Sequence, residues 1–125
     1  MNVNQKGVKG LIKVIDDLTD KGYYIFPAFD DHSPVDLVVM DTTGKIHRLQ
    51  IKYRSRISGK KKECYSIQAS SVINGARTPI NKSLIDGWAL YMVEDNKIVY
   101  VPVDKVVNTK IIYSDDVFDW ELTGK

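Results

Sequence analysis

Apolar residues near the start of the chain recur at the spacing of one face of a helix. The segment 4–20 carries five of them: Val8, Leu11, Ile12, Ile15 and Leu18. This periodicity predicts an amphipathic helix. Gly22 follows at a position where a left-handed residue commonly ends a helix. We therefore predict one helix over 4–20 that packs its apolar face on the rest of the chain.

Short apolar runs separated by turn residues then predict strands. The predicted strands are 23–26, 34–40, 46–52, 64–68, 88–93, 98–102 and an edge strand at 111–113. The polar segment 70–83, which contains Gly75 and Pro79, is predicted to be a loop or a broken helix. The order of elements favours an α/β or α+β fold with a mixed sheet and helical cover. We expect a single domain over 1–125, with 104–125 as a peripheral extension.

The runs 34–40 and 46–52 predict a β-hairpin whose turn is completed by Gly44. If the chain folds back near Thr43, residues whose numbers sum to about 86 face each other. Asp36 then lies opposite Gln50. Because side chains alternate along a strand, Gln50 and Lys52 are expected to share a face with Asp36. A carboxylate, an amide and an ammonium group would meet on one patch of the sheet.

Such a set of groups suits the hydrolysis of a phosphodiester bond. Asp36 would bind Mg²⁺ or Mn²⁺, and the Gln50 side chain and the Ile51 backbone carbonyl would add oxygen ligands. Lys52 would orient the attacking water or stabilise charge on the phosphate. Each residue taken singly is also what an ordinary strand surface carries. The expectation rests on their shared face and on the basic segment that follows.

Eight basic residues and no acid lie between Lys45 and Lys62, although the net charge of the chain is only +2. This concentration predicts a face that binds a polyanion such as double-stranded DNA. We assign five residues to DNA phosphates: Arg54, Arg56, Lys60, Lys61 and Lys62. Asn74 and Arg77 would also contact DNA, and their side chains suit base edges. A solvated surface loop would carry the same residues, so this alternative stays open.

The remaining composition excludes some classes of protein. No apolar run approaches the roughly 20 residues that span a bilayer. The first residues lack the apolar stretch of a secretory signal. The single cysteine, Cys64, rules out an internal disulfide and fits a reducing compartment. We expect a cytoplasmic protein with no membrane partner.

The chain resembles the PD-(D/E)XK nuclease superfamily, on Pro34-Val35-Asp36 and Gln50-Ile51-Lys52 over roughly residues 5–103. The Gln in the second motif is similar to the small homing endonucleases associated with group I introns in cyanobacteria and their phages. The resemblance implies an α-β-β-β-α-β core and Mg²⁺-dependent cleavage of double-stranded DNA. It also implies a homodimer or homotetramer, in the cytoplasm of a bacterial or phage-infected cell.

The chain departs from this pattern in its first helix. Many members place a Glu there near the metal, but no Glu precedes Glu63, and Gly10, Leu11 and Ile12 occupy the expected region. Three functions remain open: a homing-type DNA endonuclease, a Holliday-junction resolvase, and a nuclease-fold module that binds DNA without cleaving it.

Overall fold

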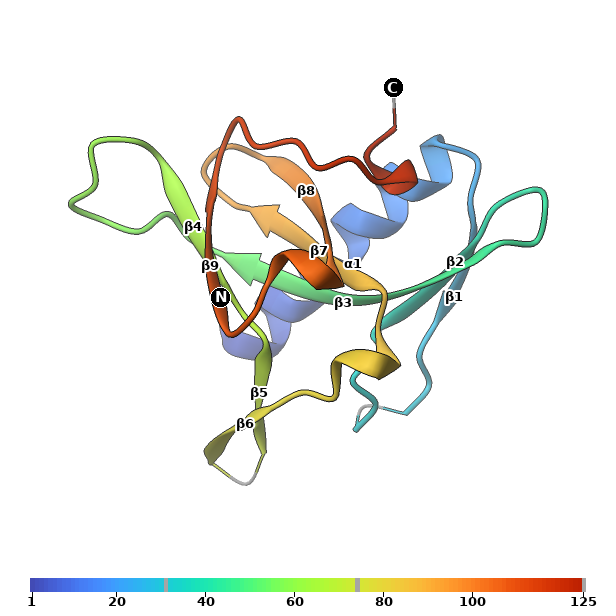
Figure 1. Ribbon diagram of the computed structural model, residues 1–125, viewed down its shortest axis with the longest axis horizontal. Coiled ribbons are helices and arrows are strands. Elements are labelled where there is room, and N and C mark those ends of the chain that lie inside the picture. The colour runs from blue at the N-terminus through green and yellow to red at the C-terminus, as the bar shows by residue number, and fades with distance from the viewer. Residues whose placement is uncertain (31, 74, 125) are drawn as a thin grey trace.

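The computed structural model describes residues 1–30, 32–73 and 75–124. A helix, α1 (Val3–Asp20), lies on one face of a five-stranded sheet with the strand order β1-β2-β3-β7-β8 (Figure 1). The sheet strands are β1 (Tyr24–Pro27), β2 (Leu37–Met40), β3 (Ile46–Arg54), β7 (Gly87–Met92) and β8 (Lys97–Pro102). Two further strand pairs are β4 (Cys64–Gln68) with β9 (Thr109–Tyr113), and β5 (Ser70–Ile73) with β6 (Ala76–Pro79). Short 3₁₀ turns are η1 (Lys82–Leu84), η2 (Val103–Lys105) and η3 (Glu121–Thr123).

The predicted helix is confirmed, and its first residue is set by a capping box. The Asn2 side chain accepts the Gln5 backbone N–H at 2.9 Å, and the Gln5 side chain accepts the Asn2 N–H at 2.9 Å. These bonds satisfy two donors that the first helical turn cannot pair internally. The chain leaves the helix through Gly22, whose φ of +89° is left-handed.

The buried face of α1 differs from the predicted apolar stripe. Val14 and Leu18 are fully buried against the sheet, whereas Val8 and Ile12 are more than half exposed. The helix therefore packs on the side centred on Gly10, Val14 and Leu18. Contact with the sheet selects this face, because the apolar pattern alone does not fix how the helix is rotated about its own axis.

The hairpin of β2 and β3 has the predicted register. Leu37 pairs with Leu49 and Met40 with Ile46 in an antiparallel ladder, and Gly44 has φ +92° in the connecting turn. On its other side, β3 runs parallel to β7. The long crossover between these two strands carries β4, β5, β6 and η1.

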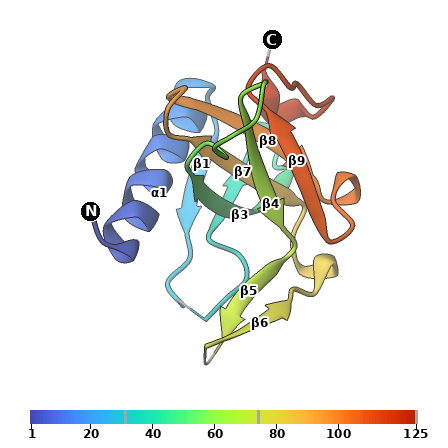
Figure 2. The ribbon, with the colours of Figure 1, turned by 90° about the vertical axis from the view of Figure 1, so that its left-hand side faces the viewer.

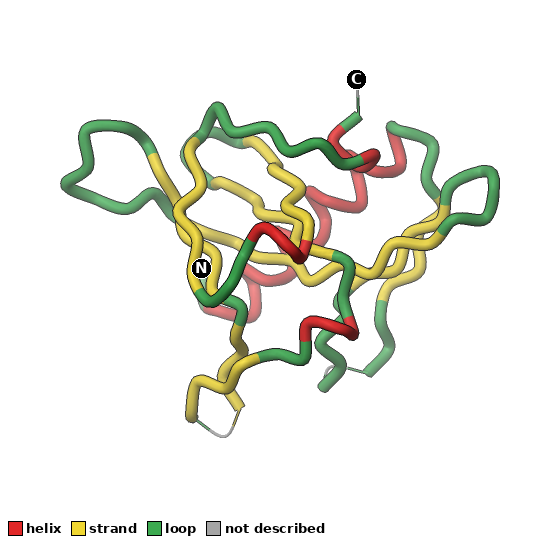
Figure 3. The backbone as a smooth tube through the Cα atoms, viewed as in Figure 1, coloured by secondary structure: helices red, strands yellow, loops and turns green. Residues whose placement is uncertain are grey.

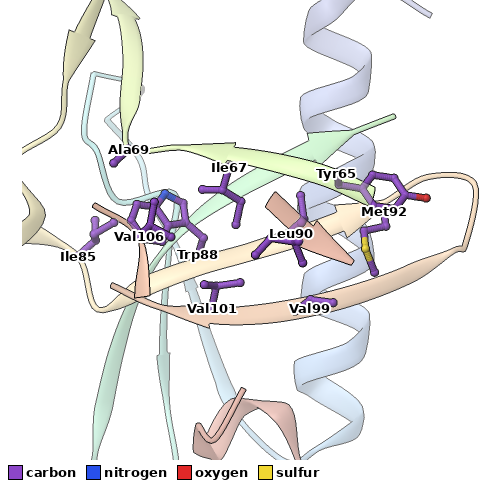
Figure 4. Packing of buried hydrophobic residues seen from close by; sticks show 11 residues of the cluster. Tyr65, Ile67, Ala69, Ile85, Trp88, Leu90, Met92, Val99, Val101 and Val106 are labelled. Atoms are coloured by element: carbon purple, nitrogen blue, oxygen red, sulfur yellow. The ribbon is translucent and has the colours of Figure 1, made fainter. Parts of the chain in front are cut away.

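The β4–β9 ribbon covers the face of the sheet opposite α1, which gives three layers (Figures 2 and 3). Tyr65 and Ile67 of β4 pack on Trp88 and Leu90 of β7 in one continuous buried cluster (Figure 4). A second cluster lies between α1 and the sheet. Strand β7, buried along its whole length between the two clusters, is the centre of the fold.

Two sequence-based expectations differ from the structure. The α/β class with a mixed sheet is confirmed, but the second helix of an α-β-β-β-α-β core is not found among the residues described between β3 and β7. The prediction of a loop or broken helix over 70–83 is wrong, because β5 and β6 pair across it. The sequence did hold a signal for this ribbon, since the dipeptide Asn-Gly at 74–75 is typical of hairpin turns.

Residues 104–124 contribute to the body of the molecule. β9 pairs with β4, and Leu122 of η3 is fully buried beside α1. In the part of the chain that the structure describes, no helix is both long enough and apolar enough to cross a membrane.

Candidate active site

Asp36 lies directly before β2 and is fixed to the backbone of β3. Its N–H donates to the Leu49 carbonyl at 2.8 Å, and its Oδ2 accepts the Ile51 N–H at 2.7 Å. The N–H and C=O of one strand residue point to the same edge, so the Ile51 carbonyl lies on the Asp36 side of β3. A carboxylate and a backbone carbonyl thus meet where β2 and β3 separate.

A pocket of about 590 Å³ opens beside this carboxylate. Asp36, Ile51 and the first turns of α1 line it, together with the loop before β2. The loop contributes Asp30, and the helix contributes Asn4. Sequence reasoning missed Asp30, because nothing in a polar loop indicates which of its acids turns toward a pocket. The oxygen-bearing side chains of this pocket therefore come from three separate segments.

Burial raises the pKa of the Asp36 carboxyl above its ordinary value. The hydrogen bond from Ile51 and the charge of Lys52 act in the opposite direction. The carboxyl group is therefore held in a site that costs it solvation, which is common for groups with chemical roles.

Lys52 lies two residues after Gln50 on β3 and is also partly buried. Its Nζ donates to the Ser70 carbonyl at 3.2 Å. Burial and the neighbouring charge of Arg54 lower the pKa of Lys52 to about 8, while Asp36 raises it. Asp36 and Lys52 each shift the pKa of the other. The structure thus brings these two predicted residues within electrostatic reach.

Gln50 is buried, and its amide faces β7 and the β5–β6 ribbon. Its Oε1 accepts the indole N–H of Trp88 at 3.0 Å. Its Nε2 donates at 3.4 Å to both the Pro34 carbonyl and the Ser71 hydroxyl. Since an indole N–H can only donate, Trp88 fixes which end of the amide is oxygen. The structure thus directs the predicted metal-binding oxygen of Gln50 toward Trp88.

The helix that the family pattern would supply with a Glu instead lines the pocket with apolar residues, one amide and one glycine. Gly10 packs on the sheet, where an added Cβ would lie 3.5 Å from Ile51 and from Tyr53. Gly7, one turn earlier, lines the pocket, and a Cβ there would meet nothing within 4 Å. Gly7 is therefore a helical position on the Asp36 pocket at which a side chain would meet open space.

The predicted DNA-contacting residues divide into two groups. Arg54 donates to the Gln68 side chain at 3.3 Å, and Arg77 of β6 donates to the Ser70 hydroxyl at 3.0 Å. Both therefore lie beside the segment that Lys52 contacts. Arg77 is exposed, whereas Arg54 is partly buried.

The loop 55–63 holds the second group. Arg56 pairs with Glu63, and Lys62 pairs with Asp115 at 3.2 Å. Lys60 and Lys61 are exposed. Ion pairs at such exposed positions contribute little to stability, so their cations can be exchanged for phosphates at small cost. The predicted contact at position 74 lies outside the described residues.

Residues 1–115 match the sequence model of the PD-(D/E)XK endonuclease family. The chain belongs to this family. The PD-(D/E)XK resemblance drawn from the 34–36 and 50–52 motifs is thereby confirmed. Comparison with curated proteins finds no significant match.

Among solved structures, the fold of this chain is similar to that of a homing endonuclease. The structure of the bacterial homing endonuclease I-Ssp6803I superposes with a TM-score of 0.72 and 20% identity. The similarity covers 93% of this chain and 81% of that chain. At this level of identity, the likeness shows a shared fold.

PD-(D/E)XK nucleases generally use divalent metal ions, and the residues around Asp36 fit a hard cation. Their donors are carboxylate, amide and backbone oxygens, the ligands that Mg²⁺ and Mn²⁺ prefer. Within residues 1–30, 32–73 and 75–124, no group of three or more His, Cys, Asp or Glu is placed to hold a metal. The chain thus supplies a partial ligand set that waters and a substrate phosphate can complete.

Proposed function

We propose that this protein is a site-specific DNA endonuclease of the homing type, which hydrolyses phosphodiester bonds with Mg²⁺ or Mn²⁺. One observation carries the proposal. In a chain of the PD-(D/E)XK family, a desolvated carboxylate at Asp36 is electrostatically coupled to a desolvated ammonium at Lys52. Burying two such groups costs stability that a purely structural strand would avoid.

Asp36 and the Ile51 carbonyl would hold the metal ion, with Asp30 near enough to line the same pocket. A bound divalent ion polarises a phosphate and lowers the pKa of a coordinated water. Lys52 stabilises the negative charge that develops on the phosphate during cleavage. A cation beside Asp36 would also offset the unfavourable free energy of burying its charged carboxylate.

Gln50 acts in this proposal through the groups it positions. Its hydrogen bonds join Pro34, just before Asp36, to Ser71 on the ribbon. Trp88 holds the amide in that orientation. Gln50 therefore keeps the segment that carries Asp36 in place against β3, and its oxygen adds a metal ligand only if the Trp88 contact opens.

The substrate in this proposal is double-stranded DNA. Arg54, Arg77 and the basic loop 55–63 supply the positive surface, which binds phosphates without regard to sequence. A single site cuts a single strand, so a double-strand break favours two copies related by a two-fold axis, in a homodimer or homotetramer. The expected setting is the cytoplasm of a bacterial or phage-infected cell.

The test measures cleavage of two substrates, randomised duplex DNA and a four-way junction, each with Mg²⁺ and with Mn²⁺. Asp36→Asn keeps an oxygen that can accept the Ile51 N–H but removes the charge, and we expect at least about 100-fold slower cleavage. Lys52→Ala should lose activity to a similar degree. Lys105→Ala, which removes an exposed charge from η2, serves as the control. A wild-type protein that cuts no DNA with either metal would refute the endonuclease proposal.

One observation favours a second candidate, a DNA-binding module that does not cleave. The helix residues that line the pocket are Val3, Asn4, Gly7, Val8 and Leu11, and none of them is an acid. On this alternative Asp36→Asn leaves DNA binding unchanged or tightens it, and added metal changes nothing. Faster cleavage of the junction than of linear duplex would instead indicate a resolvase.

A further inference from the structure

Three cationic side chains gather around the first residue of β5. Lys52 of β3 donates to the Ser70 carbonyl at 3.2 Å, and Arg77 of β6 donates to the Ser70 hydroxyl at 3.0 Å. Arg54, also on β3, donates to Gln68 at 3.3 Å, two residues before Ser70. These three residues, which we call the Ser70 cation cluster, join the strand of the active site to the β5–β6 ribbon.

The cluster has no matching set of acids among the described residues. None of its three side chains forms an ion pair there, whereas Arg56 and Lys62 of the neighbouring loop each do. The charges of the cluster act on one another. Burial and the charge of Arg77 lower the pKa of Arg54.

Like charges close together are unfavourable unless an anion offsets them, the more so where two of the three, Lys52 and Arg54, are partly buried. Each cation nevertheless keeps free donors. An ammonium has three N–H groups and a guanidinium has five. Lys52 and Arg77 each use one of them on Ser70, and Arg54 uses two, on the Tyr53 carbonyl and the Gln68 side chain. Such a set is complementary to the oxygens of a phosphate, which accept several charge-assisted hydrogen bonds at once. The neutral edge of a base would not relieve the repulsion.

We propose that the Ser70 cation cluster binds a single backbone phosphate of the DNA, and so clamps the β5–β6 ribbon to the catalytic strand. This inference rests on the proposed function and deepens it. It changes the expected role of Arg77 from contact with a base edge to contact with a phosphate. Because Arg77 and Lys52 belong to different elements, one phosphate held between them fixes the ribbon relative to Asp36.

The test measures DNA binding in EDTA, without metal and without cleavage, across a series of salt concentrations. Arg77→Gln removes one charge at an exposed position, and Lys105→Gln is the charge-matched control on η2. We expect Arg77→Gln to weaken binding about tenfold for every sequence and to reduce the log–log salt slope by about 0.9. Lys105→Gln should leave the slope unchanged. Circular dichroism checks that both variants fold.

A second measurement uses inorganic sulfate as the probe, followed by the amide NMR shifts of Ser70 and Lys52. Sulfate should shift both signals in the wild type and in Lys105→Gln, and much less in Arg77→Gln. The proposal fails if Arg77→Gln keeps the wild-type slope and sulfate response. It also fails if Arg77→Gln relaxes preference at one base pair with no change in slope, because Arg77 would then read a base.

The clamp and the endonuclease proposal fail independently. A wild-type protein that never cuts DNA, but binds it with a slope that depends on Arg77, refutes cleavage and supports the clamp. A protein that cuts DNA while Arg77→Gln binds like the wild type refutes the clamp alone.

Discussion

At the scale of single residues, Asp36 and Lys52 are held in sites that disfavour their charges. Burial raises the pKa of Asp36 and lowers that of Lys52 to about 8, and their mutual attraction offsets only part of this. Active sites commonly give up stability in this way to keep a reactive arrangement. Arg48 differs from them, because the hydrogen bond and charge of Asp86, 3.0 Å away, raise the pKa of its guanidinium and favour the charged form.

Replacing Lys52 by Met should therefore stabilise the protein while abolishing cleavage. We expect the free energy of unfolding at pH 7 to rise by on the order of 1 kcal/mol, because a partly buried charge repelled by two arginines is removed. The folded-state pKa of Lys52 lies below its ordinary 10.5. The loss of stability that the Lys52 charge causes in the wild type is therefore fully present below pH 8 and disappears as pH rises toward 10.5. Chemical denaturation of the wild type and of Lys52→Met measures the gain in stability at pH 7 and its loss at pH 10. A lower stability of Lys52→Met at pH 7 would contradict this account.

The charge of Lys52 also predicts how cleavage depends on pH. If Lys52 works as a cation, kcat/KM of the wild type should fall relative to Lys52→Arg as pH rises through about 8, the pKa of the free enzyme. The ratio of the two rates cancels the titration of other groups, including metal-bound water. Steady-state kinetics from pH 6.5 to 9.5 would show the change. A ratio that rises with pH would mean that the neutral amine acts as a base.

Gly7 offers a way to restore the acid that the first helix lacks. The residue lines the Asp36 pocket, and a side chain there meets open space. Gly7→Glu should tighten Mn²⁺ binding on the order of tenfold, because affinity rises with the number of carboxylate ligands. Calorimetric titration with Mn²⁺ measures this without any cleavage. Gly7→Gln is the neutral control, and equal affinities for the two variants would show that position 7 does not reach the metal.

At the scale of elements, the site depends on how closely β7 packs between β3 and β8. A Cβ on Gly87 would lie 2.3 Å from the Val101 carbonyl and 2.6 Å from the ring of Trp120. Asp86, just before it, accepts the Arg48 N–H at 2.7 Å and its guanidinium at 3.0 Å. These contacts set the start of β7 against β3, and so place Trp88 opposite Gln50 on the neighbouring strand.

Gly87→Ala should consequently be strongly unfavourable. Backbone and an aromatic ring must move to admit the methyl group, so we expect a loss of about 1–3 kcal/mol in the free energy of unfolding. Gly7→Ala is the matched control, because that helical position is open and alanine favours helix by about 0.5–1 kcal/mol over glycine. Urea denaturation of both variants gives the comparison. A Gly87→Ala variant as stable as the wild type would rule out the close approach.

At the scale of the whole molecule, the two faces of the sheet are covered by different layers, and the site lies where β2 and β3 separate at the rim. One chain of 14.2 kDa presents one such site. A protein that makes double-strand breaks should therefore sediment as two or four copies related by two-fold symmetry. Analytical ultracentrifugation at the concentration used for cleavage tests this. Efficient double-strand cleavage by a monomer would contradict the symmetric assembly.

The sequence by itself determined the features that depend on neighbours along the chain. The helix over 4–20, the hairpin turn at Gly44 and the register that pairs Leu37 with Leu49 follow from periodicity and turn chemistry, which act over a few residues. The family motifs lie in the same segments, so the resemblance could also be drawn before the fold was known.

Only the tertiary structure decided which groups meet from distant segments. Trp88 contacts Gln50 from 38 residues away, Asp30 lines the same pocket as Asp36, and Arg77 and Lys52 both donate to Ser70. The contacts of Ser70 depend on the path of the crossover between β3 and β7, in which a ribbon takes the place of a helix. Packing across layers sets that path, because local propensity gives polar segments such as 70–83 little preference of their own.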